Sequence, residues 1–235
     1  AAVYEGDFAL ETADDLTALE DYDCINGHVS FPESQDPNTG IVEIDNETLV
    51  TITGGLQLQN NAQIQSIRFR ELTAVGGDLS IESAANLAEV QFDALDKISG
   101  TLRLGAAADA GLPNLDALDG FDQLIEIEGD LLMLGTAIQN TNGMGSLQTI
   151  GGDLQAEDNP PMQRLDLPAL ETVSGSISVS GNEQLDRVRM RLLESVDGGF
   201  HLLENGVLDE ADMRGLVTVG GDLEIVFGKT ELYRM

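Results

Sequence analysis

The sequence predicts a mainly β fold: a right-handed parallel β-solenoid of about nine coils of 23 residues, with a short N-terminal capping helix. Three observations lead to this prediction. A glycine recurs at a nearly constant interval, apolar residues alternate on either side of it, and asparagines follow it at a fixed distance. Self-similarity at a fixed period of this length is the signature of architectures built from stacked repeats.

The recurring glycine is the second one of VGGDL at 75–79 and 219–223 and of IGGDL at 150–154. Successive equivalents are separated by 27, 23, 23, 29, 23, 23, 23 and 23 residues. We expect a bend at which the backbone passes so close to the next coil that no side chain fits. These structural glycines are Gly27, Gly54, Gly77, Gly100, Gly129, Gly152, Gly175, Gly198 and Gly221.

Apolar residues alternate both after and before this glycine. After Gly175, Ile177 and Val179 are apolar and the residue between them is polar. A second alternating segment, here called the second comb, precedes the next glycine and contains Val188 and Met190. Alternation with a period of two turns one set of side chains inward and the other outward. A unit of 23 residues has no partner for its apolar face, but stacked units bury one another. Each repeat is therefore expected to contain two short parallel strands joined by bends.

Asparagines lie seven residues after the glycine in four repeats. An asparagine inside such a bend can bond the backbone of the next coil, so a column of them forms a ladder. We assign these residues a structural role. They are Asn61, Asn159, Asn182 and Asn205.

The frame L-x-x-I-x-G-x-L-x-I and the opening FALETADDLTALEDYDCINGHVSF (8–31) resemble the receptor L-domain group. This group is a relative of the leucine-rich repeats, and ISVSGN (177–182) is similar to their core L-x-L-x-x-N. It includes ligand-binding domains of growth-factor receptors, fungal wall-anchored proteins and bacterial surface proteins, so the resemblance implies a solenoid with a role in recognition. Members often carry paired cysteines near the start. Cys24 is the single cysteine here, so it stays unpaired within the chain or pairs outside it.

The resemblance also implies that a strand and a short helix cap the first coil. The strand is expected in 4–10. The segment 12–21 is typical of a helix, with Thr12 as its N-cap and with Asp14 and Asp15 in its first turn, where negative charge is favourable.

The chain is interpreted as a single domain, 1–235, with an N-terminal cap over 1–24, repeats over 25–227 and a tail over 228–235. The tail is too short for another coil, so the last sheet edge is thinly covered. We expect end-on stacking there with another module or subunit.

Composition excludes several classes of partner. Acids outnumber bases 42 to 11, and the net charge of −31 repels nucleic acids and anionic membranes. Aromatic residues make up 4% with no tryptophan, which argues against base-stacking platforms and sugar-stacking clefts. No apolar run is long enough for membrane insertion. The opening AAVYEGDF fits a mature end left after removal of a signal peptide, so we expect an extracellular or cell-surface location.

An acidic cluster is the one arrangement that suggests a metal or a reaction. Alternation places Asp130, Asp153 and Glu157 on the outer face of neighbouring coils. Two carboxylates about 5 Å apart raise each other's pKa or share a cation such as calcium. The alternative is a solvated acidic face without function, and this is the interpretation we favour. No cofactor is expected, with calcium left as the open possibility.

The two longest coils offer candidate contacts, because insertions in solenoids become protruding loops that often lie on the binding side. Further candidates stand in the outward rows of the main sheet. Leu132 and Leu134 form either an exposed apolar spot that marks a contact site or a pair covered by a neighbouring loop. The candidate ligand-binding residues are Glu33, Asp36, Arg103, Asp109, Asn114, Leu132, Leu134, Gln155 and His201.

Arginines gather on the second comb. Asp166, Arg189 and Asp212 share one offset in successive coils, whereas Arg164 and Arg187 share another with Glu210. These are interpreted as charge ladders between coils, with a partner surface as the alternative. The other arginines of this comb are Arg68, Arg70, Arg191 and Arg214.

The expected function is non-enzymatic recognition or adhesion with a protein or glycan partner, an idea that comes from the resemblance. Two alternatives stay open. One is a polysaccharide-active β-helix enzyme that uses Asp130, Asp153 and Glu157, and the other is a passive spacer within a larger surface protein.

Overall fold

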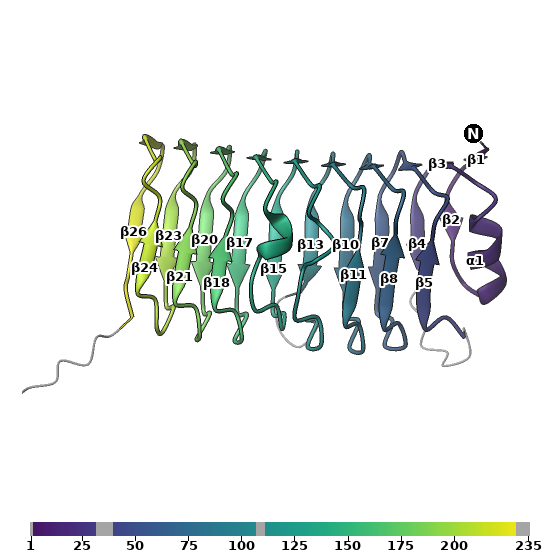
Figure 1. Ribbon diagram of the computed structural model, residues 1–235, viewed down its shortest axis with the longest axis horizontal. Coiled ribbons are helices and arrows are strands. Elements are labelled where there is room, and N and C mark those ends of the chain that lie inside the picture. Colours follow the sequence, from purple (N-terminus) through teal and green to yellow (C-terminus); the bar gives the residue numbers. More distant parts are fainter. Residues whose placement is uncertain (1, 32–39, 107–110, 229–235) are drawn as a thin grey trace, which may run out of the picture.

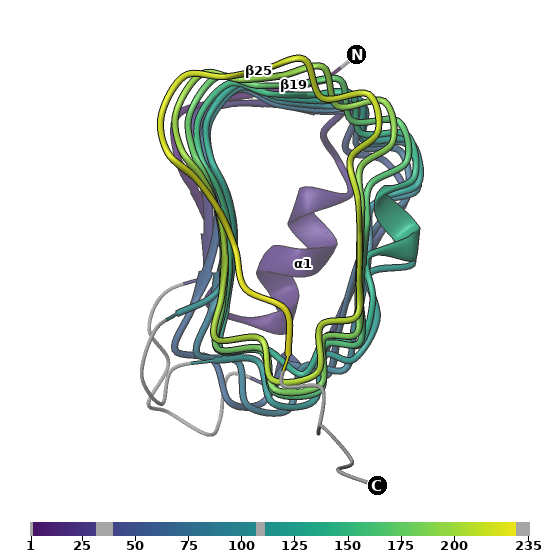
Figure 2. The same ribbon diagram turned by 90° about the vertical axis from the view of Figure 1, so that its left-hand side faces the viewer.

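The computed structural model describes residues 2–31, 40–106 and 111–228. It is a β-solenoid in which about nine coils stack into a rod (Figure 1). The chain winds in the right-handed sense when followed in Figure 2. All pairings between neighbouring strands are parallel, so the fold class predicted from the sequence is confirmed.

The main sheet contains ten strands, one from each successive turn of the chain. Leu131 pairs with both Leu102 and Leu154, so the coil with six extra residues keeps the same register as its neighbours. The strands are β2 (Phe8–Ala9), β4 (Val29–Phe31), β7 (Leu56–Gln59), β10 (Leu79–Glu82), β13 (Leu102–Gly105), β15 (Leu131–Leu134), β17 (Leu154–Glu157), β20 (Ile177–Ser180), β23 (Phe200–Leu203) and β26 (Leu223–Ile225).

A second ten-stranded sheet lies just before the recurring glycine, where no separate strand was expected. Its strands are mostly two residues long and place one aliphatic residue each in the core. They are β1 (Val3–Glu5), β3 (Cys24–Asn26), β6 (Thr51–Ile52), β9 (Ala74–Val75), β12 (Lys97–Ile98), β14 (Glu126–Ile127), β16 (Thr149–Ile150), β19 (Thr172–Val173), β22 (Ser195–Val196) and β25 (Thr218–Val219).

The second comb forms the third wall, which is divided into two separate sheets. Between them the alternation of the sequence is lost, and the short 3-10 helix η1 (Asn142–Met144) replaces a strand. The first sheet contains β5 (Glu43–Asn46), β8 (Ser66–Phe69) and β11 (Glu89–Gln91). The second contains β18 (Arg164–Asp166), β21 (Arg187–Arg189) and β24 (Glu210–Asp212).

The interior is a continuous apolar core that runs along the rod. Side chains that point inward stack on their equivalents in the next coil, and most are fully buried. Phe69, Phe92 and Phe121 form one such column, with ring centroids 5.8 and 5.4 Å apart. Repetition of the same apolar position every coil therefore builds the core.

The helix α1 (Ala13–Leu19) lies across the N-terminal end of this core (Figure 2). The carboxylate of Asp15 accepts hydrogen bonds from the backbone N–H of Thr12 at 2.8 Å and from its hydroxyl at 2.9 Å. The hydroxyl of Thr12 holds the pKa of Asp15 below its usual value. Leu19 is fully buried, so the predicted cap is confirmed with slightly shorter bounds.

The C-terminal end has no such cover within the described residues. Leu223 is 56% exposed, although its equivalents Phe200 and Ile177 in the two preceding coils are fully buried. Val217 and Phe227 are exposed as well, at 79% and 53%. End-on stacking of another module or subunit at this end stays a prediction. Residues 229–235 lie outside the described part. In that part, no helix has both the length and the apolar character needed to cross a membrane.

Candidate functional site: a cavity on the arginine wall

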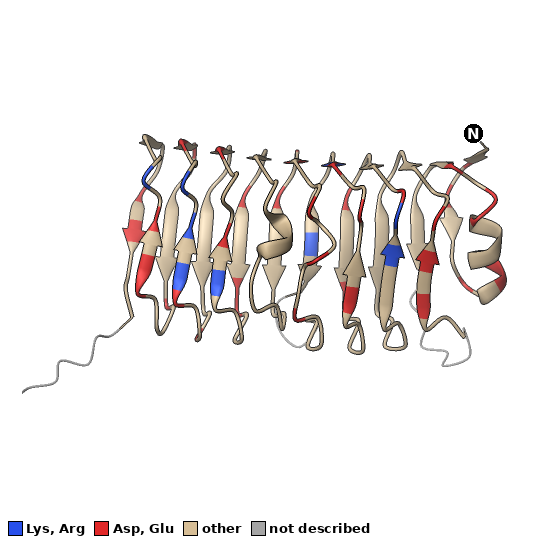
Figure 3. Ribbon diagram, viewed as in Figure 1, with Lys and Arg blue, Asp and Glu red and all other residues tan. Residues whose placement is uncertain are grey.

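The sheet of β18, β21 and β24, together with the residues that closely follow its strands, carries five of the eight described arginines. We call its outer face the arginine wall. Figure 3 shows basic residues on β18 and β21 beside acidic residues on β24. The predicted register is confirmed: Arg187 stands between Arg164 and Glu210, and Arg189 between Asp166 and Asp212.

The ion pairs of this wall run diagonally rather than straight along the predicted ladders. Arg189 donates two hydrogen bonds to Glu210, at 2.7 and 2.8 Å, although it stands opposite Asp166 and Asp212. Glu210 also accepts from Arg187 at 3.1 Å. A charged and bidentate contact of this kind is stronger than a neutral hydrogen bond. Hydrogen bonding to Arg189 lowers the pKa of Glu210 and raises that of the guanidinium.

Asp212 forms a second centre of charge. It accepts from Arg191 at 2.7 Å and from both Nε and Nη2 of Arg214, at 2.9 and 2.7 Å. The hydrogen bonds from Arg214 and then Arg191 hold the pKa of Asp212 well below its usual range. Both acids of β24 are thus ionised at neutral pH and fix the arginines beside them.

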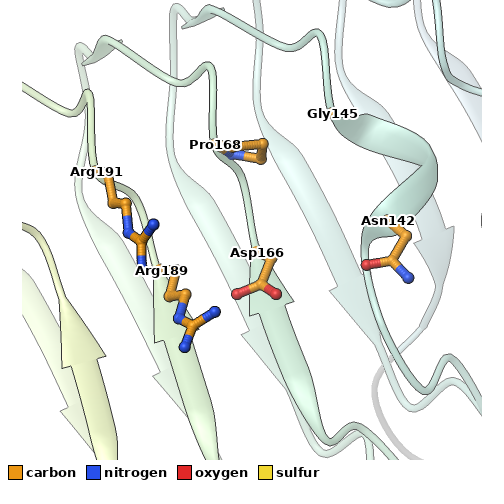
Figure 4. Close-up of a pocket in the computed structure, with 6 residues that line it drawn as sticks. All are labelled: Asn142, Gly145, Asp166, Pro168, Arg189 and Arg191. Carbon is orange, nitrogen blue, oxygen red and sulfur yellow. The ribbon is translucent and has the colours of Figure 1, made fainter.

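A cavity of about 250 Å³ opens on this wall. Figure 4 shows its residues on three successive coils, with η1 and the loop after it on one side and two arginine side chains on the other. The lining residues are Asn142, Gly145, Asp166, Pro168, Arg189 and Arg191.

Asp166 is held in place by its backbone. The buried hydroxyl of Thr141 donates to the carbonyl oxygen of Asp166 at 2.8 Å and accepts from its N–H at 2.9 Å. This contact replaces the strand pairing that is lost where η1 begins. The position of Asp166 is therefore set by the coil before it.

The carboxylate of Asp166 has no hydrogen-bond partner, because Arg189 bonds to Glu210 instead, although its charge still acts on the guanidinium of Arg189. Its Oδ1 atom is buried and has no hydrogen bond within the described residues. Unsatisfied buried acceptors are rare and costly, so an atom of this kind calls for an explanation.

The arginines of the cavity keep free donors. In the described part of the chain, Nη1 of Arg189 and both Nη atoms of Arg191 have no hydrogen bond to protein. The side-chain amide of Asn142, an exposed residue, has none either. The cavity thus brings one unpaired acceptor and several unpaired donors together beside the ring of Pro168.

The three carboxylates of the acidic cluster form hydrogen bonds to neighbouring coils. Oδ1 of Asp130 accepts from the N–H of Asp153 at 2.8 Å, and Oδ1 of Asp153 accepts from the N–H of Ser176 at 2.7 Å. Glu157 accepts from the hydroxyl of Ser178 at 2.8 Å. In the described ranges, no three His, Cys, Asp or Glu side chains are grouped as metal ligands would be.

Of the two alternatives for Leu132 and Leu134, the structure supports the covered pair and contradicts the exposed apolar spot. The two side chains are only 5% and 9% exposed, and they lie outside the main core on the outer face of β15. The covered alternative is therefore correct for both residues, and they form no exposed apolar spot.

The remaining candidates do not form one cluster, although Arg103, Gln155 and His201 stand in one outward row of the main sheet. Asn114 is exposed, and its amide donates to the carbonyl of Ala85 at 2.6 Å. Arg103, Gln155 and His201 are half-buried on β13, β17 and β23, the first 3.8 Å from Glu82. Three further candidates lie outside the described residues: Glu33, Asp36 and Asp109.

Sequence reasoning placed Arg189 and Asp166 on one wall but missed the cavity. The signal that pointed to it is the loss of alternation over 138–146, which ends the regular wall and introduces η1. Asn142 and Pro168 become neighbours only because the coils stack in register.

Comparison with known proteins adds no family: no family model matches the chain, and no curated protein or solved structure matches it. The likeness to receptor L domains therefore stays a prediction.

Proposed function

We propose that the protein is a non-enzymatic recognition or adhesion module, extracellular or displayed at a cell surface, that binds a protein or glycan partner through the arginine wall. The observation that carries this proposal is the set of polar atoms without hydrogen bonds around one cavity, which includes Oδ1 of Asp166, one of two buried side-chain atoms without a hydrogen bond in the described residues. Polar groups left without partners in a stable structure are the groups a ligand can satisfy.

The solenoid supports this role mechanically. Side chains on neighbouring coils are held at the strand spacing of about 4.8 Å by continuous ladders, so the wall presents fixed groups to a partner. The extracellular location draws its support from the acidic composition and from the resemblance to surface proteins.

The test is a binding screen with a matched pair of variants. The purified chain is applied to a glycan array and to an array of secreted proteins, together with Arg189→Ala/Arg191→Ala. We expect saturable binding to at least one partner, and we expect the double variant to lose it.

Arg70→Ala serves as the control. Arg70 pairs with Asp45 at 3.0 and 3.1 Å on the other three-stranded sheet. The substitution therefore removes the same kind of ion pair at a place away from the cavity. The proposal is overturned if no partner of either class binds, or if Arg70→Ala abolishes binding while the double variant retains it.

A further inference from the structure

We infer that the cavity on the arginine wall holds a single neutral sugar ring, with Asp166 as hydrogen-bond acceptor and Arg189 and Arg191 as donors. This inference rests on the proposed recognition function and names the chemical class of its ligand. It is carried by the size, the polar groups and the charge of the cavity.

The size favours one ring. Pockets for drug-sized ligands span roughly 300–1,000 Å³. The cavity here, at about 250 Å³, is smaller. At about 30 Å³ for each water molecule it holds roughly eight waters, a volume that suits one pyranose with its hydroxyl groups.

The polar groups match hydroxyls better than any other common group. A hydroxyl donates one hydrogen bond and accepts others, so it can bridge a carboxylate and a guanidinium at the same time. Asp166 supplies the acceptor, Arg189 and Arg191 supply donors, and the amide of Asn142 supplies both. Neighbouring hydroxyls on a ring satisfy several of these groups together, which strengthens each bond.

The Oδ1 atom of Asp166 is buried, whereas the residue as a whole is partly exposed. Rotation about the Cβ–Cγ bond has broad energy wells, so either oxygen of the carboxylate can turn to a ligand. The ring of Pro168 is exposed beside it and offers an apolar surface to the C–H groups of a sugar.

Charge argues against an acidic or a basic ligand. An anionic sugar meets the unpaired carboxylate of Asp166 and the field of a chain whose net charge is −31. A cationic ligand meets Arg189 and Arg191 at the cavity edge. A neutral polyol avoids both penalties and still pairs with the groups of either sign.

The inference is tested by two-dimensional NMR titration of the full chain with methyl glycosides of glucose, galactose and mannose, and with methyl glucuronide as the anionic probe. We expect at least one neutral glycoside to shift the Gly145 amide and the Asn142 side-chain amide in a saturable way. Asp166→Asn replaces an acceptor oxygen by a donor, so it should weaken this binding about tenfold or more.

Asn142→Ala is a second variant that does not endanger folding, because its side chain is exposed and makes no hydrogen bond within the described residues. It should also weaken the binding, whereas Arg70→Ala should leave it unchanged. Thermal melting of each variant verifies that the fold is intact.

The sugar-ring inference is overturned if no neutral glycoside shifts these signals, if glucuronide binds more tightly than every neutral probe, or if both cavity variants bind as the parent does. If a protein on the array still binds in a way that depends on Arg189 and Arg191, the recognition function is retained and only the sugar-ring inference is rejected. Failure of both experiments removes both proposals.

Discussion

Single residue positions in this protein act as columns, because each is repeated in register through the stack. The amide of Asn182 donates to Ala156 O at 2.8 Å, and its oxygen accepts from the N–H of Asn159 at 3.0 Å. Asn205 repeats the pattern one coil later. In the coil that precedes Asn159, the buried Thr136 takes the place of asparagine and donates to the side-chain oxygen of Asn159. The predicted ladder is thereby confirmed for Asn159, Asn182 and Asn205, whereas Asn61 accepts from the N–H of Gln63 in its own turn at 3.0 Å.

The glycine column has the strictest steric demand. From Gly54 onward, each glycine N–H of the column donates to the glycine carbonyl of the coil before, as from Gly152 to Gly129 at 2.9 Å and from Gly129 to Gly100 at 3.0 Å. A Cβ on Gly129 would lie 2.7 Å from backbone atoms of Gly100, so one coil would have to move away from the other. The close approach expected from the sequence is confirmed.

Gly129→Ala should therefore lower the free energy of unfolding by about 1–3 kcal/mol, the usual cost of overfilling a packed site. Urea denaturation followed by circular dichroism measures the change. Gly145→Ala is the matched control, since the nearest atom to its Cβ would be 3.6 Å away. Equal stability of the two variants would contradict the steric role of the column.

At the scale of elements, the third wall behaves differently from the two long sheets. Its strands form only where the sequence alternates between apolar and polar residues. On its outer face, ion pairs of Glu210 with Arg187 and Arg189 join β24 to β21. Surface ion pairs contribute modestly, but here Glu210 serves two arginines at once. The link between these strands therefore depends on an ionised carboxylate.

Glu210→Gln should lower the melting temperature at pH 7. The folded pKa of Glu210 is depressed by Arg189, so its stabilisation is present above the unfolded value of about 4.3 and is lost as pH falls through the lower folded value. The difference between parent and variant should therefore narrow below about pH 4.

Melting curves from pH 3 to pH 7 measure this difference. Glu183→Gln changes an exposed carboxylate that makes no side-chain hydrogen bond or ion pair within the described residues, so it should match the parent at every pH. If the difference in melting temperature between the parent and Glu210→Gln stayed constant down to pH 3, the electrostatic role of Glu210 would be refuted.

At the scale of the whole molecule, the rod combines a continuous core with a net charge of −31. Like charges repel and destabilise the compact state, and salt screens that repulsion. Asp130 and Asp153, the strongest calcium candidates from the sequence, each commit one oxygen to the backbone of the next coil.

We therefore expect added salt to raise the melting temperature, and calcium to act no more strongly than magnesium at the same ionic strength. Differential scanning fluorimetry with NaCl, MgCl₂ and CaCl₂ compares the three. A rise specific to calcium, lost in Asp130→Asn/Asp153→Asn, would show a calcium site that bridges the coils.

The sequence alone determined the repeat, the inward apolar columns, the glycine and asparagine ladders and the N-terminal helix. Each of these depends on a residue type at a fixed spacing, and spacing is visible in one dimension. The register of Arg164, Arg187 and Glu210 could be predicted for the same reason.

Only the tertiary structure decided which groups pair across that register. Arg189 turns to Glu210 and leaves Asp166 unpaired, and Leu132 and Leu134 are covered although alternation points them outward. The cavity arises where η1 interrupts the third wall beside β18. Such choices depend on side-chain directions and on contacts between coils in three dimensions, which a spacing pattern does not contain.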